Sequence, residues 1–245
     1  MTLEILGSGS SGNCYLFKPK IGKSLIIDCG VNFKTVKQAL DFDTTSVCGV
    51  LQTHSHGDHS KFTKEFLNAG IDIYMSKENR DEIDIFSHRI KTIEPLKKLE
   101  VGDFKVMAFD LEHDVRCFGY LINHPESGRY ILITDTYYCK YTFPGLNNII
   151  IEANYSKGII DRKFGSDSGK EFLRNRILRS HFSLANCKDM LSANDLTQVN
   201  NIVLIHLSDS NSDEKQFHKE VYELTGKNVT VATNGMKINF CKTPF

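Results

Sequence analysis

A cluster of histidines and an aspartate directly follows a short apolar run, and it limits what this chain can fold into. Residues 50–59 read Val-Leu-Gln-Thr-His-Ser-His-Gly-Asp-His. His54 and His56 are two residues apart, so at a strand end their side chains point the same way and can share one cation. Asp58 and His59 follow a glycine turn and can face a second cation. Imidazole and carboxylate together suit Zn²⁺, Mn²⁺, Fe or Co²⁺ better than Ca²⁺.

Three further potential ligands stand at the carboxyl ends of other predicted strands. His113 follows a strand at 105–110, Asp135 follows Tyr130–Thr134, and His206 ends the apolar run 202–205. One such residue alone is usually structural. Three of them, in the order His, Asp, His after an HxHxDH motif, are not expected by chance. The sequence therefore predicts that loops at several strand ends bring seven side chains to one centre.

The HxHxDH motif with these three residues resembles the ligand pattern of the metallo-β-lactamase-fold hydrolases, and the resemblance covers nearly the whole chain. It implies one metal held by His54, His56 and His113, another held by Asp58, His59 and His206, and Asp135 as the bridge. Two cations about 3.5–4 Å apart share a hydroxide that attacks the substrate, and Asp58 can orient it. Zn²⁺ is the first expectation for both cations and Mn²⁺ the second.

The predicted strands form two groups, each interleaved with helices. Strands are expected at Thr2–Leu6, Asn13–Lys18, Ser24–Cys29, Val47–Thr53, Ile71–Met75, Asp103–Asp110, Cys117–Asn123, Tyr130–Thr134, Asn147–Ile151, Asn201–Leu207, Asn228–Ala232 and Met236–Phe240. Helices are expected at Phe33–Leu40, Asp58–Asn68, Lys77–His88, Ser166–Ser180, Leu184–Leu191 and Ser212–Thr225, and a loop at Lys91–Glu100. With the resemblance, this order implies an α/β protein, a four-layer αβ/βα sandwich in one domain over residues 1–245.

Two segments outside the ligand pattern indicate the chemistry. Glu152 stands in Ile-Glu-Ala-Asn at the end of an apolar strand, and His181 stands in His-Phe-Ser before a helix. They resemble the HEAT and HST motifs of ribonuclease Z, although the flanking residues differ. The resemblance implies a dyad in which His181 is a general acid or phosphate clamp and Glu152 holds its ring. A capping histidine on a surface helix is the alternative.

Other polar residues allow structural or functional interpretations. Asp28 ends an apolar strand and either supports the histidine loop, as the resemblance implies, or serves as a helix N-terminal acid. His124 lies in a predicted turn and is expected to be exposed and inert, and His88 is expected on the surface. The turn Ser-Gly-Ser-Ser-Gly-Asn at 8–13 joins two strands, which excludes a P-loop; it resembles the YycJ-type bacterial branch.

Charge is balanced overall but not locally. Lys+Arg and Asp+Glu both number 30, so nothing attracts the whole chain to nucleic acid. Residues 157–179 carry seven basic side chains against three acidic ones, a local excess of +4 just before His181. They are Lys157, Arg162, Lys163, Lys170, Arg174, Arg176 and Arg179 against Asp161, Asp167 and Glu171. A solvated helix face and a phosphate-binding rim are both compatible with this excess.

Cysteine usage and hydropathy indicate the compartment. The seven cysteines are scattered without a CxxC pair, which is typical of a reduced, cytosolic chain. The sequence shows no signal peptide and no apolar run long enough to span a membrane. We therefore expect a cytoplasmic protein, in the host cytoplasm if a phage encodes it. The resemblance also implies a homodimer.

These observations favour a metal-dependent phosphodiesterase that acts on nucleotides. Two substrates stay open. One is a polynucleotide, because the YycJ-type relatives resemble DNA exonucleases and ribonuclease Z cuts tRNA precursors. The other is a cyclic mononucleotide, because phage anti-Pycsar phosphodiesterases share the fold and the dyad. The alternative function is hydrolysis of a thioester or lactone, as in glyoxalase II. The paired Glu152 and His181 count against that alternative.

Overall fold

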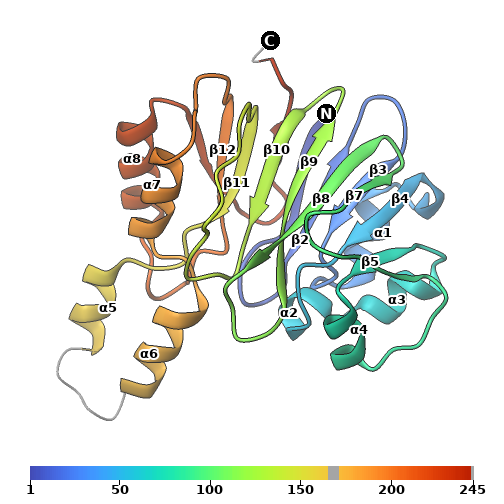
Figure 1. The fold of residues 1–245 in the computed structure, drawn as a ribbon, viewed down its shortest axis with the longest axis horizontal. Helices are drawn as coiled ribbons and strands as arrows, with labels where there is room; N and C mark the ends of the chain where they lie inside the picture. Colours follow the sequence, from blue (N-terminus) through green and yellow to red (C-terminus); the bar gives the residue numbers. More distant parts are fainter. Residues whose placement is uncertain (165–170, 244–245) are drawn as a thin grey trace.

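Two seven-stranded sheets pack face to face, and helices cover the outer face of each (Figure 1). The computed structural model describes residues 1–164 and 171–243, without the side chains of 164, 171–173 and 176. Layers of helix, sheet, sheet and helix confirm the αβ/βα sandwich that the sequence predicted.

The first sheet has the strand order β14-β1-β2-β3-β4-β5-β6. Its strands are β1 (Thr2–Gly7), β2 (Cys14–Lys18), β3 (Ser24–Ile27), β4 (Val47–Leu51), β5 (Ile73–Met75), β6 (Ile90–Thr92) and β14 (Lys237–Asn239). The pairs from β14 to β3 are antiparallel, and those from β3 to β6 are parallel.

The second sheet has the order β13-β12-β11-β10-β9-β8-β7. Its strands are β7 (Lys98–Val101), β8 (Phe104–Leu111), β9 (Cys117–His124), β10 (Gly128–Ile133), β11 (Asn148–Glu152), β12 (Asn201–Ile205) and β13 (Asn228–Val231). The pairs from β10 to β13 are parallel, so β10, β11 and β12 end at the same edge of the sheet.

The helices lie mainly in the connections between parallel strands. They are α1 (Phe33–Ala39), α2 (Gly57–Ser60), α3 (Thr63–Asn68), α4 (Lys77–Ile83), α5 (Lys157–Phe164), α6 (Glu171–Ser180), α7 (Leu184–Ser192) and α8 (Glu214–Thr225), with a 3-10 turn at Thr44–Ser46. The pair α5 and α6 extends away from the sandwich at the lower left of Figure 1.

Strand alternation builds three apolar layers. In β11, Ile150 faces the core between the sheets, whereas Ile149 and Ile151 face the outer core beneath the helices. Because both faces are covered, β11 is buried along its whole length, as expected of a central parallel strand. A matching outer core lies on the first sheet, where Phe33 and Phe66 pack with ring centroids 4.7 Å apart.

The structure corrects several predicted boundaries. The loop expected at Lys91–Glu100 instead contributes β6 and β7. The helix expected at Asp58–Asn68 is divided into α2 and α3, and the one expected at Lys77–His88 ends at Ile83, before Asp84 in a left-handed conformation. Helix α5 was not predicted. Of the helix expected at Ser166–Ser180, residues 166–170 lie outside the described residues.

Candidate metal centre

All seven side chains that the sequence predicted as ligands meet where β4, β8, β10 and β12 end. Within the described residues, donor atoms within 4.8 Å of one another form these groups: His54, His56 and His113; Asp58, His59 and His206; His54, His59 and Asp135; and Asp135, Glu152, His181 and His206. The first group, called the first ligand set below, and the second, the second ligand set, are those that the family resemblance implied.

The first ligand set is a triangle of imidazole rings. His54 and His56 come from the loop after β4, and His113 comes from the loop after β8. Ring centroids are 4.8 Å apart for His54 and His56, and 5.0 Å apart for each of these with His113. Nδ1 of His56 lies 3.3 Å from Nε2 of His113. Three ring nitrogens can therefore reach one cation.

The second ligand set joins the two sheets. Asp58 and His59 lie on α2 after β4, whereas His206 follows β12. Oδ2 of Asp58 lies 3.4 Å from Nε2 of His59 and 3.5 Å from Nε2 of His206. One carboxylate oxygen and two imidazole nitrogens thus face one another.

Asp135 lies between the two sets. It follows β10, and its Oδ2 is 3.1 Å from Nε2 of His59. Oδ2 also accepts a hydrogen bond from the Thr134 hydroxyl at 2.5 Å. Because Asp135 groups with His54 of the first set as well as with His59 of the second, its carboxylate is placed to bridge two cations.

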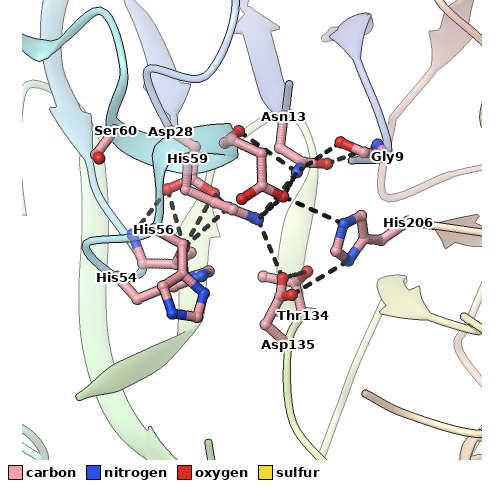
Figure 2. A network of polar contacts seen from close by, with 12 residues as sticks. Gly9, Asn13, Asp28, His54, His56, His59, Ser60, Thr134, Asp135 and His206 are labelled. Atoms are coloured by element: carbon pink, nitrogen blue, oxygen red, sulfur yellow. Dashed lines mark hydrogen bonds and ion pairs between the residues drawn. The ribbon is translucent and has the colours of Figure 1, made fainter. Parts of the chain in front are cut away.

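Asp28 lies against the histidine loop, beside His59 (Figure 2). It is fully buried and accepts hydrogen bonds from the backbone N–H of Thr53 at 2.8 Å and from Nδ1 of His59 at 2.7 Å. With Nδ1 of His59 bound to a carboxylate, Nε2 keeps its lone pair for the metal side. These contacts favour the supporting role over the helix N-terminal one.

The donor set fits a pair of divalent cations. Nε2 of His54 is buried and has no hydrogen-bond partner. Such an orphaned acceptor is costly in a protein interior unless something binds it. Nδ1 of the same ring lies 3.0 Å from the Thr53 hydroxyl, so Nε2 is the atom left to bind a metal. Imidazole and carboxylate donors suit Zn²⁺ and related transition metals.

Glu152 and His181 form the pair that the sequence predicted. Nδ1 of His181 lies 2.8 Å from Oε1 of Glu152, at the end of β11. Oε2 of Glu152 accepts the backbone N–H of Phe182 at 3.1 Å, which fixes the carboxylate. Glu152 is fully buried, whereas the His181 side chain is 25% exposed. His181 therefore presents its other nitrogen to an open space while Glu152 holds the ring.

Charged groups at the centre shift the pKa values of their neighbours. Burial opposes the charged form of His181, but the charge and hydrogen bond of Glu152 raise its pKa above the ordinary histidine value. Burial alone would raise the pKa of Asp135, but His206 and His59 lower it well below the usual aspartate value. Asp135 therefore stays ionised, and His181 is favoured as a proton donor.

Three residues of the centre have a left-handed backbone. φ is 66° at Asp28, 50° at Asp135 and 55° at His206. Non-glycine residues adopt this conformation at a cost of about 1–3 kcal/mol, and they do so where the surrounding structure enforces it. In each case a strand has just ended, and the sharp change of direction turns the side chain into the centre.

A cavity of about 350 Å³ opens beside the two sets. It is lined by Ser10, His56, Asp58, His113, Asp114, Asp135, Asn154, Ile177, Ser180, His181, His206, Leu207, Ser208, Asp209, Ser210 and Asn211. Ile177 and Ser180 come from α6, so this helix forms part of one wall. Asp114 adds a half-exposed carboxylate 3.0 Å from Nε2 of His113.

The basic segment lies on this helical pair. Nη2 of Arg174 pairs with Asp161 at 2.8 Å, and Nζ of Lys163 contacts the Ser210 carbonyl at 3.5 Å. Arg179 is exposed near the end of α6. Lys170 and Asp167 lie outside the described residues, and the side chains of Glu171 and Arg176 are not described. The phosphate-binding rim stays a prediction.

Sequence reasoning missed several residues of the centre and misjudged one histidine elsewhere. Asn13, which ends the small-residue turn, donates to Oδ2 of Asp58 at 3.3 Å, and its Nδ2 lies 2.9 Å from Nε2 of His59. Asn154, the last residue of Ile-Glu-Ala-Asn, donates to the His206 carbonyl at 2.7 Å. His124 is 3% exposed rather than on the surface, because it packs against the Phe104 ring with centroids 4.5 Å apart. His88 is exposed, as expected.

Comparisons with known proteins agree with this geometry. Residues 7–83 match the family model of the metallo-beta-lactamase superfamily. The exodeoxyribonuclease YycJ of Bacillus anthracis is 28% identical over 169 residues, which are 62% of this chain and 62% of that protein. Ribonuclease Z of Lachnoclostridium phytofermentans is 27% identical over 128 residues, 45% of this chain and 42% of that protein. The matches thus span less than two thirds of these relatives.

The solved structures extend the likeness to the whole fold. The metallo-beta-lactamase fold protein YhfI from Bacillus subtilis superposes with a TM-score of 0.74 at 17% identity, covering 97% of this chain and 98% of that one. At this identity the likeness establishes the fold alone. No helix among residues 1–164 and 171–243 is long and apolar enough to cross a membrane.

Proposed function

We propose that this chain, which carries a metallo-β-lactamase superfamily domain on that fold, is a two-metal phosphodiesterase that hydrolyses nucleotide phosphodiester bonds. Residues 1–245 would act as one hydrolase domain. The observation that supports this most strongly is the Glu152–His181 pair, 2.8 Å apart, at the edge of a cavity that the two ligand sets also line. Hydrolysis of a thioester needs the metals but gives this pair no obvious task.

The roles follow from the contacts. Two divalent cations, Zn²⁺ before Mn²⁺, would supply a water of lowered pKa as the nucleophile and neutralise charge that develops on the phosphate oxygens. Asp58 lines the cavity and can orient the attacking water. Since Nδ1 of His181 is engaged by Glu152, its Nε2 carries the proton that the leaving oxygen takes up as the P–O bond breaks.

Two substrate classes remain for the same chemistry. The exonuclease relative favours the end of a polynucleotide, and the cavity of about 350 Å³ is at the small end of the usual ligand-pocket range of roughly 300–1,000 Å³. Both classes, a polynucleotide end and a cyclic mononucleotide, place a single nucleotide at the cations. The structure of the cavity therefore supports a one-nucleotide site within either class.

The test compares ester classes on the metal-loaded protein. We expect turnover of bis-p-nitrophenyl phosphate and none of a thioester, and we expect Asp58→Asn and His181→Asn to reduce diester cleavage. His88→Asn, which changes an exposed histidine, is the matched control. Turnover of the thioester alone would replace this proposal with the glyoxalase-like alternative. Linear DNA, RNA, and 2′,3′- and 3′,5′-cyclic nucleotides then separate the substrates.

Location and assembly stay predictions. We propose a cytoplasmic protein from its scattered cysteines, none of which is paired in the described structure. Fluorescence of a tagged full chain would test the location. The homodimer is tested by sedimentation velocity, in which a particle of twice the 27.8 kDa chain mass is expected.

A further inference from the structure

The turn between β1 and β2 contacts both halves of the second ligand set. Asp58 and His59 of this set follow a strand of the first sheet, and His206 follows a strand of the second. Ser8, at one end of the turn, contacts His206, and Asn13, at the other end, contacts Asp58 and His59. The turn therefore bridges the two sheets at the metal centre.

Ser8 holds the backbone of His206. The N–H of His206 donates to the Ser8 hydroxyl oxygen at 3.0 Å, while its carbonyl accepts from Asn154 at 2.7 Å. His206 has a left-handed backbone with φ of 55°, which is strained for a residue with a side chain. Hydrogen bonds on both sides of His206 fix this conformation and so fix the direction of its ring.

Asn13 holds the side chains of the other two ligands (Figure 2). It is fully buried, and the N–H of Gly9 donates to its Oδ1 at 2.9 Å, which fixes the orientation of the amide. Nδ2 of Asn13 then faces Oδ2 of Asp58 at 3.3 Å and Nε2 of His59 at 2.9 Å. Its backbone N–H also donates to the Asp58 carbonyl at 2.7 Å.

Tyr15 joins the two ends of the turn. Its buried hydroxyl donates to Oδ1 of Asn13 at 3.2 Å, and the Ser8 hydroxyl lies 3.3 Å from the same tyrosine oxygen. Because Tyr15 has one proton and gives it to Asn13, the Ser8 hydroxyl donates to Tyr15. An unbroken chain of hydrogen bonds thus runs from the His206 backbone through Ser8, Tyr15 and Asn13 to the Asp58 carboxylate.

We propose that Ser8, Tyr15 and Asn13 are positioning residues that hold Asp58 and His206 at the spacing a cation in the second ligand set requires. The inference rests on the proposed two-metal function and adds residues to it. Groups that orient ligands from outside the coordination sphere typically change metal affinity by about 10–100-fold when removed. None of the hydrogen bonds described above for Ser8, Tyr15 and Asn13 reaches a side chain of the first ligand set, so the loss is expected at one of the two cations.

The test measures metal binding, independently of catalysis. Tyr15→Phe removes one oxygen and keeps the buried ring, Ser8→Ala breaks the link to His206, and Asn13→Ala breaks the link to Asp58. Tyr130→Phe is the matched control, because that hydroxyl is equally buried but has no hydrogen-bond partner. Zn²⁺ bound per chain is measured after dialysis, and stepwise affinities by competition with a chromophoric chelator.

We expect wild type and Tyr130→Phe to bind two Zn²⁺ and the three variants to lose affinity for one, by about 10–100-fold in Asn13→Ala. Comparison with His206→Ala and His113→Ala, which each disable one set, identifies the weakened set as the second. If Tyr15→Phe and Ser8→Ala each bind both Zn²⁺ ions as tightly as wild type, the inference is overturned and the proposed function stands. An equal loss of Zn²⁺ affinity at both ligand sets in folded variants would also overturn the inference.

A wild-type chain that binds a single cation would instead remove the two-metal function together with this inference. Circular dichroism establishes that each variant is folded. If Asn13→Ala does not fold, Tyr15→Phe and Ser8→Ala still decide the outcome, because each removes a single oxygen.

Discussion

Oε1 of Glu152 lies 2.8 Å from Nδ1 of His181. The same oxygen lies 3.0 Å from Nδ1 of His206, so one buried carboxylate holds both the candidate proton donor and a candidate metal ligand. Substitutions at Glu152 therefore combine two effects, on the acid and on the metal centre. Substitutions at His181 act mainly through the first effect, because His181 belongs to neither ligand set and reaches only Asp135 among the candidate ligands, with Nδ1 3.4 Å from its Oδ1.

Replacement of His181 should affect substrates according to their leaving group. We expect His181→Asn to lower kcat about 10²–10⁴-fold for a diester that releases a sugar hydroxyl, because such an oxygen needs a proton as it departs. For bis-p-nitrophenyl phosphate the loss should be smaller, since nitrophenolate leaves without one. Bound metal, measured alongside, should not change. Equal losses on both substrates would assign His181 to phosphate binding instead.

Gly30 is predicted to tolerate no side chain. A Cβ there would lie 1.7 Å from the Asp58 carbonyl oxygen and 2.6 Å from the Asn13 nitrogen, both backbone atoms. Gly30→Ala should therefore lower the free energy of unfolding by about 1–3 kcal/mol, and it should weaken metal binding because Asp58 is displaced. Gly57→Ala is the control in the same region, since nothing lies within 4 Å of its Cβ position. Urea denaturation measures the free energy of unfolding of both variants. Equal values for Gly30→Ala and Gly57→Ala would contradict the prediction.

His124 should make the fold sensitive to mild acid. Burial lowers its pKa in the folded state, although Glu126 and Asp103 oppose this. The unfolded chain takes up the proton near pH 6.5, at about the ordinary histidine value. Stability from neutral His124 is thus fully present above that pH and is lost as pH falls toward the lower folded-state pKa.

His124→Asn removes the titrating group while keeping an acceptor for the Glu126 N–H, which contacts Nδ1 of His124 at 3.2 Å. The fall in the urea midpoint between pH 7.5 and pH 5.5 should be smaller in this variant than in wild type. Other titrating groups, including those of the metal centre, are common to both proteins and cancel in the comparison. An identical fall in both would show that His124 does not contribute.

The sequence predicted much of this molecule because local signals marked it. His113, Asp135 and His206 each follow an apolar run, and the structure places each at a strand end beside the histidine loop. Their roles as ligands stay predictions. The strands β6 and β7 were missed because they are only three and four residues long and mostly exposed, and pairing with β5 and β8 decides their conformation. The burial of His124 was missed because Phe104, a distant residue, causes it.

The role of Asn13 could not be read from its own segment. The small-residue turn predicted a hairpin, and only the assembled fold places the Asn13 amide beside Asp58, 45 positions further along the chain. Asn154 shows the same limit, because its partner is the carbonyl of His206, 52 positions away. Residues that act through others have no local pattern, since their partners are set by the packing of the sheets.

The candidate ligands are divided between the two sheets, four on the loop after β4 and three on the second sheet. Neither sheet alone can complete a coordination sphere, so tight metal uptake has to wait until both have come together. Cations bound there would cross-link the two sheets, and any motion that parts the sheets would first have to release them.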